Sequence, residues 1–239
     1  MTFLLPDSIQ AGEIVESFAE IGVLAFTTGR ATGSFGTGTD EPVCDVMARW
    51  SALRALVGGG RARLATATQV HGTMIIEHGG DWRGWLRGED ADGHLSHERG
   101  TAMAVTVADC VPVFLVHPSG AAVALHSGWR GTAGRITVRA IERLGVLGLP
   151  ASELRLHCGP AICGQCYAVS PDVYGQLTGR SVSAPATVDL RALIADDARA
   201  LGVRAISVSP FCTKCDNDRF YSHRAGDAGR QLGVILARI

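Results

Sequence analysis

The stretch Ala121–Thr132, AAVALHSGWRGT, is the one around which the rest of the chain is organised. Its first half is a run of small apolar residues that predicts a buried β-strand, and a helical pattern follows its second half. Between the two lies a polar segment that contains His126, Trp129 and Arg130. A histidine that can serve as a metal ligand or a general base, an aromatic ring and a cation therefore lie close together at a strand end.

Strand-like segments precede this stretch in close succession. Residues 101–108 and 111–117 have strand length and are rich in valine and alanine, and Pro118-Ser119-Gly120 predicts the turn before 121–125. We expect these three segments to form the sheet at the centre of the molecule. Further strands are expected over 23–28, 63–70, 73–77, 154–158 and 203–208.

Apolar residues recur at helical spacing elsewhere. We expect helices over 43–57, ended by Gly58-Gly59-Gly60, from Thr132 onward, and over 188–201, and Ser170-Pro171-Asp172 predicts a further helix start. The C-terminal segment is also expected to be a helix, with Ala228, Leu232, Ile235, Leu236 and Ile239 on one face. The polar, glycine-rich stretches between elements are 29–39 and 78–100.

Length and composition indicate a globular protein with a single domain over residues 1–239. The net charge of −1 disfavours nucleic acid or an acidic membrane surface as a partner. No apolar run reaches the roughly 18 residues of a membrane span, and the N-terminus lacks the features of a secretory signal. The odd number of seven cysteines favours reduced thiols or thiolate ligands over a disulfide framework. We therefore expect a cytoplasmic protein.

Three residues with side chains that can bind a metal lie at the ends of strand-like segments. They are His71, Cys110 and His126. If these strand ends meet at one edge of a sheet, one thiolate and two imidazoles form a ligand set of the catalytic zinc type, with a fourth position open. Such an ion keeps a net charge near +1 and can acidify a bound water. The spacing alone is not diagnostic, and the alternatives are a hydrogen-bonded core histidine and a small buried cysteine.

Cys110 and His126 also suit a different chemistry. A cysteine nucleophile and a histidine base, oriented by Asp109 or another carboxylate, are typical of cysteine hydrolases. The order of the residues does not separate this interpretation from a metal site.

Arg130 stands where the strand gives way to a helical pattern. Free amide groups at a helix start, the small residues 131–134 and the guanidinium indicate a phosphate or carboxylate site, and an ion pair with a nearby acid is the alternative. Trp129 suits stacking on a purine or another aromatic substrate, although packing in the core is the commoner use of tryptophan.

Two further cysteine pairs have the spacing of zinc knuckles, Cys163-x2-Cys166 and Cys212-x2-Cys215. Together they could build a structural tetrathiolate. The pairs are further apart than in the usual zinc ribbon and both lie beside turn residues, so we favour thiols in buried turns. A deaminase zinc motif is not supported, because no HxE precedes the PCxxC-like segment 160–166.

Several motifs in order resemble one family. They are QVHG (69–72), ADCVPV (108–113), HSGWRGT (126–132), GPAICGQCY (159–167) and FYSHRAGDAGR (220–230). The chain is similar through them to the laccase-domain family, whose members were first described as multicopper polyphenol oxidases and are now regarded as zinc-dependent purine nucleoside phosphorylases with adenosine deaminase activity.

The resemblance implies a metal held by His71, Cys110 and His126. It also implies a mixed α/β (α+β) fold with a mixed sheet, related to the catalytic domain of cytotoxic necrotizing factor. The implied reactions are phosphorolysis of adenosine, inosine, guanosine and methylthioadenosine and deamination of adenosine, with purine nucleosides and phosphate as the partners. Some bacterial members are linked instead to editing of peptidoglycan precursors.

Departures from the family pattern affect two of the motifs. The family has an arginine directly after the FTT strand, where this chain has Gly29, with Arg30 one residue later. The resemblance assigns Arg30 to phosphate, together with Arg224 of the SHR motif. The motif GPAICGQCYAV lacks a cysteine and the glutamate after Tyr167 that the family carries.

Two alternatives to the phosphorylase remain at this point. Copper in the same ligands would make a polyphenol oxidase, since copper displaces zinc from His/Cys sites. A metal-stabilised module that binds a nucleoside or a cell-wall precursor without turnover is the second. The oligomeric state is not encoded in any of these motifs.

Overall fold

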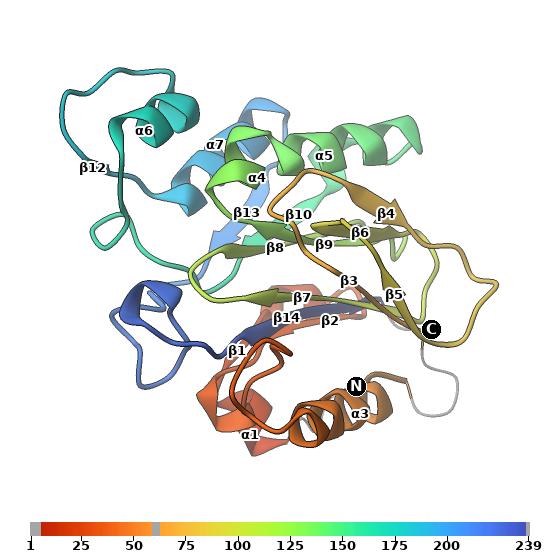
Figure 1. Ribbon diagram of the computed structural model, residues 1–239. Helices are drawn as coiled ribbons and strands as arrows, with labels where there is room; N and C mark the ends of the chain where they lie inside the picture. The colour runs from red at the N-terminus through yellow and green to blue at the C-terminus, as the bar shows by residue number, and fades with distance from the viewer. Residues whose placement is uncertain (1–5, 59–62, 238–239) are drawn as a thin grey trace.

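The computed structural model describes residues 6–58 and 63–237, which form four layers (Figure 1). Two six-stranded sheets pack face to face in the middle. One outer layer is α3 (Val43–Gly58), and the other contains α5 (Ile136–Val146) and α7 (Leu190–Ala200). None of the described helices combines the length and the apolar character needed to cross a membrane.

Sheet A is the sheet that α3 covers. In spatial order its strands are β1 (Glu13–Ile14), β2 (Val23–Thr27), β14 (Gln231–Ala237), β7 (Thr101–Val107), β3 (Arg63–Ala67) and β5 (Gly84–Gly88). The sheet is mixed, because β3 is parallel to both of its neighbours while the other pairs are antiparallel.

Sheet B lies under α5 and α7. In spatial order its strands are β13 (Ala205–Val208), β10 (Arg155–Cys158), β8 (Val111–Val116), β9 (Ala122–Ser127), β6 (Gly93–Ser96) and β4 (Ile75–Glu77). The outer pairs β10–β13 and β4–β6 are parallel, and the inner pairs are antiparallel.

The remaining elements are short. They are α1 (Asp7–Gln10), α2 (Glu16–Ala19), η1 (Arg30–Thr32), α4 (Trp129–Ala133), η3 (Ala151–Glu153), β11 (Ala168–Val169), α6 (Pro171–Thr178), β12 (Ala186–Thr187) and η4 (His223–Ala225). Ser170 caps α6 as predicted, because its hydroxyl accepts a hydrogen bond from the N–H of Val173.

The core between the sheets explains the apolar strands. Phe114 of β8 and Ala124 of β9 pack against Met103 of β7 and Ile235 of β14, and all four are fully buried. Strands buried on both faces are apolar at successive positions, not at alternate ones. The predicted strands over 101–108, 111–117 and 121–125 are confirmed, but β7 belongs to sheet A whereas β8 and β9 belong to sheet B.

The predicted C-terminal helix is wrong. Residues 231–237 form β14, which lies between β2 and β7 and is buried along its whole length. Apolar residues at nearly every position fit a helical pattern and a strand pattern equally well, so periodicity could not distinguish a helix from a strand here. Gly233 shows how closely the sheets approach there, since a Cβ at this position would lie 2.8 Å from Cβ of Pro112.

The helices over 43–57 and 188–201 are confirmed by α3 and α7. Gly59 and Gly60, predicted to end the first of them, lie outside the described residues. The polar excursion over 78–100 is more structured than its composition suggested, because it contains β5 and β6.

Candidate metal centre

His71, Cys110 and His126 meet at one end of the two sheets. Their ligand atoms all lie within 4.8 Å of one another. His71 follows β3 of sheet A, Cys110 lies in the turn from β7 to β8, and His126 belongs to β9 of sheet B. The expected position at one edge of a single sheet is therefore wrong: the cluster bridges two sheets, because the β7–β8 turn crosses from one to the other.

The loop that carries His71 is held at two points. The Gln69 side-chain amide donates to the Thr106 carbonyl at 2.8 Å, and its oxygen accepts from the N–H of Thr106 at 2.8 Å. The backbone N–H groups of residues 70–72 all donate to the carboxylate of Asp92, at 2.6–3.1 Å. His71 itself has a positive φ of 59°, which these contacts maintain.

Asp92 also orients the second histidine. Its Oδ1 accepts a hydrogen bond from Nδ1 of His126 at 2.7 Å, which leaves Nε2 of His126 available to the cluster. Burial raises the pKa of Asp92, but the hydrogen bonds from His126 and from the N–H of Gly72 outweigh burial and hold the pKa below its ordinary value. Asp92 was not predicted from the sequence, because nothing in the acidic segment 89–92 distinguishes it from its neighbours.

Cys110 and His126 favour each other's charged form when no metal is present. Burial raises the pKa of the Cys110 thiol, but the neighbouring imidazoles of His126 and His71 lower it below its ordinary value. Burial lowers the pKa of His126, but Cys110 and Asp92 raise it above its ordinary value. The cysteine is thus held as a thiolate, the form that binds metals.

Gly128 keeps the space between the ligands open. A Cβ at this position would lie 2.8 Å from Sγ of Cys110 and 3.1 Å from Cδ2 of His71. Its φ of −79° is accessible to any residue, so this glycine is required for space and not for conformation. The donor set, its close spacing and this gap fit a zinc ion with a position left for a further ligand.

A cavity of about 560 Å³ opens over the cluster, a size usual for small-molecule sites. Besides the three candidate ligands, its lining includes Trp129, Arg130, Ile162, Tyr167, Arg224 and Arg230. Three arginines line the cavity and make it suited to an anion, and Nη1 of Arg230 also donates to the backbone carbonyls of residues 227–229. Burial raises the pKa of Tyr167 to about 12, so its phenol stays a hydrogen-bond donor at neutral pH.

Arg130 is free to bind a ligand. Its guanidinium lies 4.4 Å from the centre of the Trp129 ring, and within the described residues it forms no ion pair. The helix expected to begin here is broken, because α4 has five residues and Arg135, in a left-handed conformation, precedes α5. The cation, and not a long helix, is the feature at this position that is suited to an anion.

Asp109 supports the cavity wall. Its carboxylate accepts hydrogen bonds from Oγ1 of Thr213 at 2.7 Å and from the N–H of Arg224 at 2.6 Å. It therefore does not contact His126, and Asp92 occupies the orienting position instead. Arg224 is held beside Tyr167, 5.1 Å from the ring centre, and its guanidinium donates to the carbonyl of Ala168.

Arg30 does not line the cavity. Its guanidinium pairs with Asp227, donates to the carbonyl of Asn217 and lies 4.5 Å from the centre of the Tyr221 ring. Arg230, which was not singled out from the sequence, lines the cavity. Arg30, which is shifted by one residue from the position of the arginine in the family pattern, therefore uses its hydrogen-bond donors on other residues of the fold.

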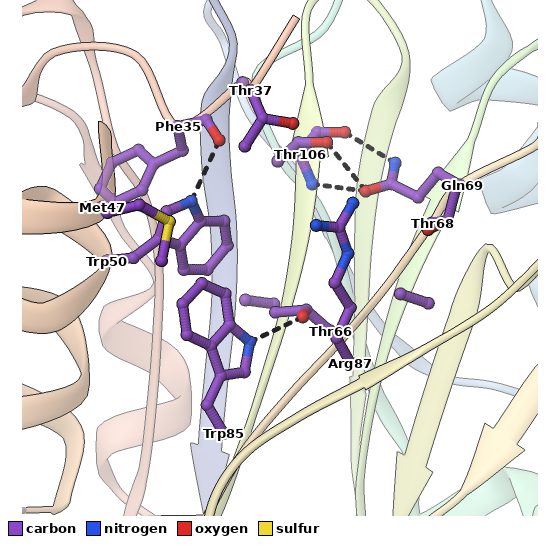
Figure 2. Close-up of a pocket in the computed structure, with 13 residues that line it drawn as sticks. Phe35, Thr37, Met47, Trp50, Thr66, Thr68, Gln69, Trp85, Arg87 and Thr106 are labelled. Atoms are coloured by element: carbon purple, nitrogen blue, oxygen red, sulfur yellow. Dashed lines mark hydrogen bonds between the residues drawn. The ribbon is translucent and has the colours of Figure 1, made fainter. Parts of the chain in front are cut away.

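A second cavity, of about 380 Å³, lies on the side of sheet A that faces α3 (Figure 2). Trp50 of α3 and Trp85 of β5 stack in it with ring centres 4.9 Å apart. Gln69 and Thr106 line both cavities. Figure 2 shows the Arg87 side chain extending toward them. Because Gln69 and Thr106 line both cavities, the hydrogen-bonded pair that holds the His71 loop lies between the two spaces.

Comparison with known proteins bears on this geometry. Residues 29–238 match the family described as "Multi-copper polyphenol oxidoreductase laccase". The chain belongs to this family. The laccase-family match includes all three candidate metal ligands.

Two of the similar proteins are named for reactions of nucleosides. The chain is 33% identical to "Purine nucleoside phosphorylase ORF3" of Streptomyces griseus, over 82% of each protein. It is also 33% identical to "Adenosine deaminase RL5" of an unknown prokaryotic organism, over 63% of this chain and 60% of that protein. The laccase-family fold is shared with YlmD of Geobacillus stearothermophilus, with a TM-score of 0.84, 28% identity and coverage of 91% and 93% of the two chains.

Proposed function

We propose that this laccase-family chain is a zinc-dependent purine nucleoside phosphorylase that also deaminates adenosine. The observation that carries the proposal is the cluster of His71, Cys110 and His126 at the floor of a cavity lined by three arginines. The names of its relatives support both reactions.

In phosphorolysis, the bond between the ribose C1′ and the purine nitrogen breaks, a C1′–O bond to phosphate forms, and the purine leaves with a proton. Zinc held by the three ligands would supply a Lewis acid for an oxygen of the reactants. Arg130, Arg224 and Arg230 would bind the phosphate charges, and the ring of Trp129 would face the nucleoside. Tyr167 would donate a hydrogen bond into the cavity.

In deamination, the purine carbon bonded to the amino group gains an oxygen from water and ammonia leaves. The metal ligands and the residues that position them would have the same roles in both reactions, whereas the arginines would bind phosphate only in phosphorolysis. Asp92 holds His126 in one orientation, and Ile162 helps to close the cavity wall. The two reactions would therefore share one pocket and compete for it.

Substrate profiling of the zinc-loaded protein tests the proposal. Adenosine, inosine, guanosine and methylthioadenosine are incubated with and without phosphate. Release of the sugar 1-phosphate (5-methylthioribose 1-phosphate from methylthioadenosine, ribose 1-phosphate from the other three) and release of ammonia are measured separately. We expect the sugar phosphate to form only with phosphate present, and ammonia from adenosine without it. Absence of both products from every nucleoside would contradict the proposal.

A copper-dependent polyphenol oxidase is the second candidate, favoured by the family description and by the affinity of His/Cys ligands for copper. Metal analysis of protein never exposed to added copper separates the two. Zinc with nucleoside turnover supports the phosphorylase, whereas bound copper with phenol oxidation supports the oxidase.

We also propose that the protein acts in the cytoplasm as one domain over residues 1–239. All seven cysteines are free, which suits a reducing compartment. The relation to the catalytic domain of cytotoxic necrotizing factor stays a prediction, and superposition of the two folds would test it.

A further inference from the structure

Two pairs of cysteines that are far apart in the sequence come together outside the site described above. The sulfur atoms of Cys163, Cys166, Cys212 and Cys215 all lie within 4.8 Å of one another. We refer to these residues as the four-cysteine cluster. No role in the proposed nucleoside chemistry uses it.

Parallel strand pairing brings the two pairs together. β10 and β13 are parallel neighbours, with Cys158 opposite Val208 at their ends. The chain leaves both strands at the same edge of sheet B, and each following loop carries one pair. A parallel bridge between Ala161 and Cys212 continues the alignment into the loops.

The backbone around the sulfurs has the features of a metal knuckle. The N–H groups of Cys163 and Cys215 both point at Sγ of Cys212, at 3.3 and 3.4 Å. The N–H of Cys166 donates to the carbonyl of Cys163, which closes the turn of the first pair. Amide donors directed at a sulfur stabilise the negative charge of a thiolate ligand.

We propose that the four-cysteine cluster binds a structural zinc ion, distinct from the one at His71, Cys110 and His126. Four thiols lose four protons and the zinc ion gains four sulfur ligands, with no oxidation or reduction. A tetrahedral site with Zn–S bonds of about 2.3 Å requires sulfur atoms about 3.8 Å apart, close to the observed arrangement. The 3.5 Å between Sγ of Cys166 and Sγ of Cys215 is too long for a disulfide and suits two ligands of one ion.

The zinc would stabilise one wall of the large cavity. Ile162 and Tyr167, which line that cavity, directly adjoin Cys163 and Cys166 in sequence. Thr213 adjoins Cys212 and donates its hydroxyl to Asp109. An ion that joins the two loops would thus hold both sides of the wall in place without touching a substrate.

Zinc stoichiometry of the full-length protein tests this proposal. The variant Cys110→Ala removes a ligand of the first cluster, and we expect it to retain one zinc per chain. Adding Cys166→Ser and Cys215→Ser should remove that zinc and lower the melting temperature. Cys44→Ser is the matched control, because Cys44 is an exposed free cysteine outside both clusters, and it should retain the zinc content of the parent.

If the serine variant retains the zinc of its parent, the proposal is wrong. If it does not fold, cobalt added to the Cys110→Ala chain gives a second readout. Intense sulfur-to-cobalt absorption from a tetrathiolate supports the site, and its absence rejects it. These readouts do not depend on nucleoside turnover, so failure of the phosphorylase proposal would leave this result unchanged.

Discussion

Nδ1 of His126 lies 2.7 Å from Oδ1 of Asp92, and this hydrogen bond connects the two halves of the candidate metal centre. The same carboxylate accepts the backbone N–H groups of residues 70–72 in the loop that carries His71. One buried side chain therefore positions two candidate ligands, one in the loop that follows β3 of sheet A and the other in β9 of sheet B. A carboxylate behind a histidine ligand also fixes which ring nitrogen faces the metal.

Asp92→Asn should weaken zinc binding. The substitution removes the negative charge behind His126 while it keeps the shape of the side chain, and loss of such a contact costs about 10- to 100-fold in metal affinity. Competition with a chelator measures the zinc Kd. Glu153→Gln is the matched control, because Glu153 accepts from Nε2 of His117 at 3.0 Å, away from the cluster, and this variant should bind zinc as the wild type does.

Gly128→Ala should abolish zinc binding at the first cluster without unfolding the protein. The added methyl group would lie 2.8 Å from Sγ of Cys110, in the space that the ion needs. Metal analysis and thermal melting are the measurements. Gly145→Ala in α5 is the control, since nothing lies within 4 Å of its Cβ, and it should raise stability by about 0.5–1 kcal/mol. Full zinc content in Gly128→Ala would show that the ion is held elsewhere.

Arg130→Gln should raise the KM for phosphate by about 10- to 100-fold, since a charge-assisted hydrogen bond contributes about 1.5–3 kcal/mol. Zinc content should not change, because Arg130 is not a ligand. Arg30→Gln is the informative comparison: its guanidinium pairs with Asp227, so we expect a lower melting temperature with an unchanged KM. A KM effect in Arg30→Gln alone would return the phosphate site to the position assigned from the sequence.

Asp227→Asn should destabilise the protein in a pH-dependent manner. Partial burial raises the pKa of Asp227, but hydrogen bonds from Arg30, Asn217 and the N–H of Ser222 outweigh burial and lower the pKa below its ordinary value. A carboxylate with a lowered pKa stabilises the fold above the unfolded-state value of about 3.9, and this contribution is lost as the pH falls through the folded-state pKa.

Urea unfolding of metal-free protein measures this effect. The free energy of unfolding of the wild type should exceed that of Asp227→Asn by about 1–2 kcal/mol at pH 7. This difference in free energy should shrink as the pH falls below about 4. A constant difference across this range would mean that shape, and not charge, accounts for the contribution of Asp227.

Local patterns were sufficient for much of the fold. The valine- and alanine-rich segments predicted β7, β8 and β9, and the capping signal at Ser170 predicted α6. Each of these depends on residues close in sequence. β14 was assigned to a helix because its apolar residues fit either period, and only pairing with β2 and β7, more than 100 residues away, makes it a strand.

The same division applies to the candidate site. The residue types and motifs pointed to His71, Cys110 and His126 as candidate ligands, and the structure brings the three together. The orienting carboxylate, expected to be Asp109 or another acid, is Asp92. Arg30 was assigned to phosphate from the family pattern after the FTT strand, whereas Arg230 lines the cavity. Which carboxylate or guanidinium arrives at a given point depends on loop paths, and these are not encoded in spacing.

By itself the sequence determined the chemistry available to this protein: two imidazoles and a thiol after strand-like segments, a cation beside Trp129, and two CxxC pairs. Only the tertiary structure decided that β7 and β8 belong to different sheets, that Asp92 holds the ligands, and that the four cysteines meet. The reason is physical. Residue types and short periods reflect local conformation, whereas strand pairing and the packing of two sheets are selected by burial of the whole chain.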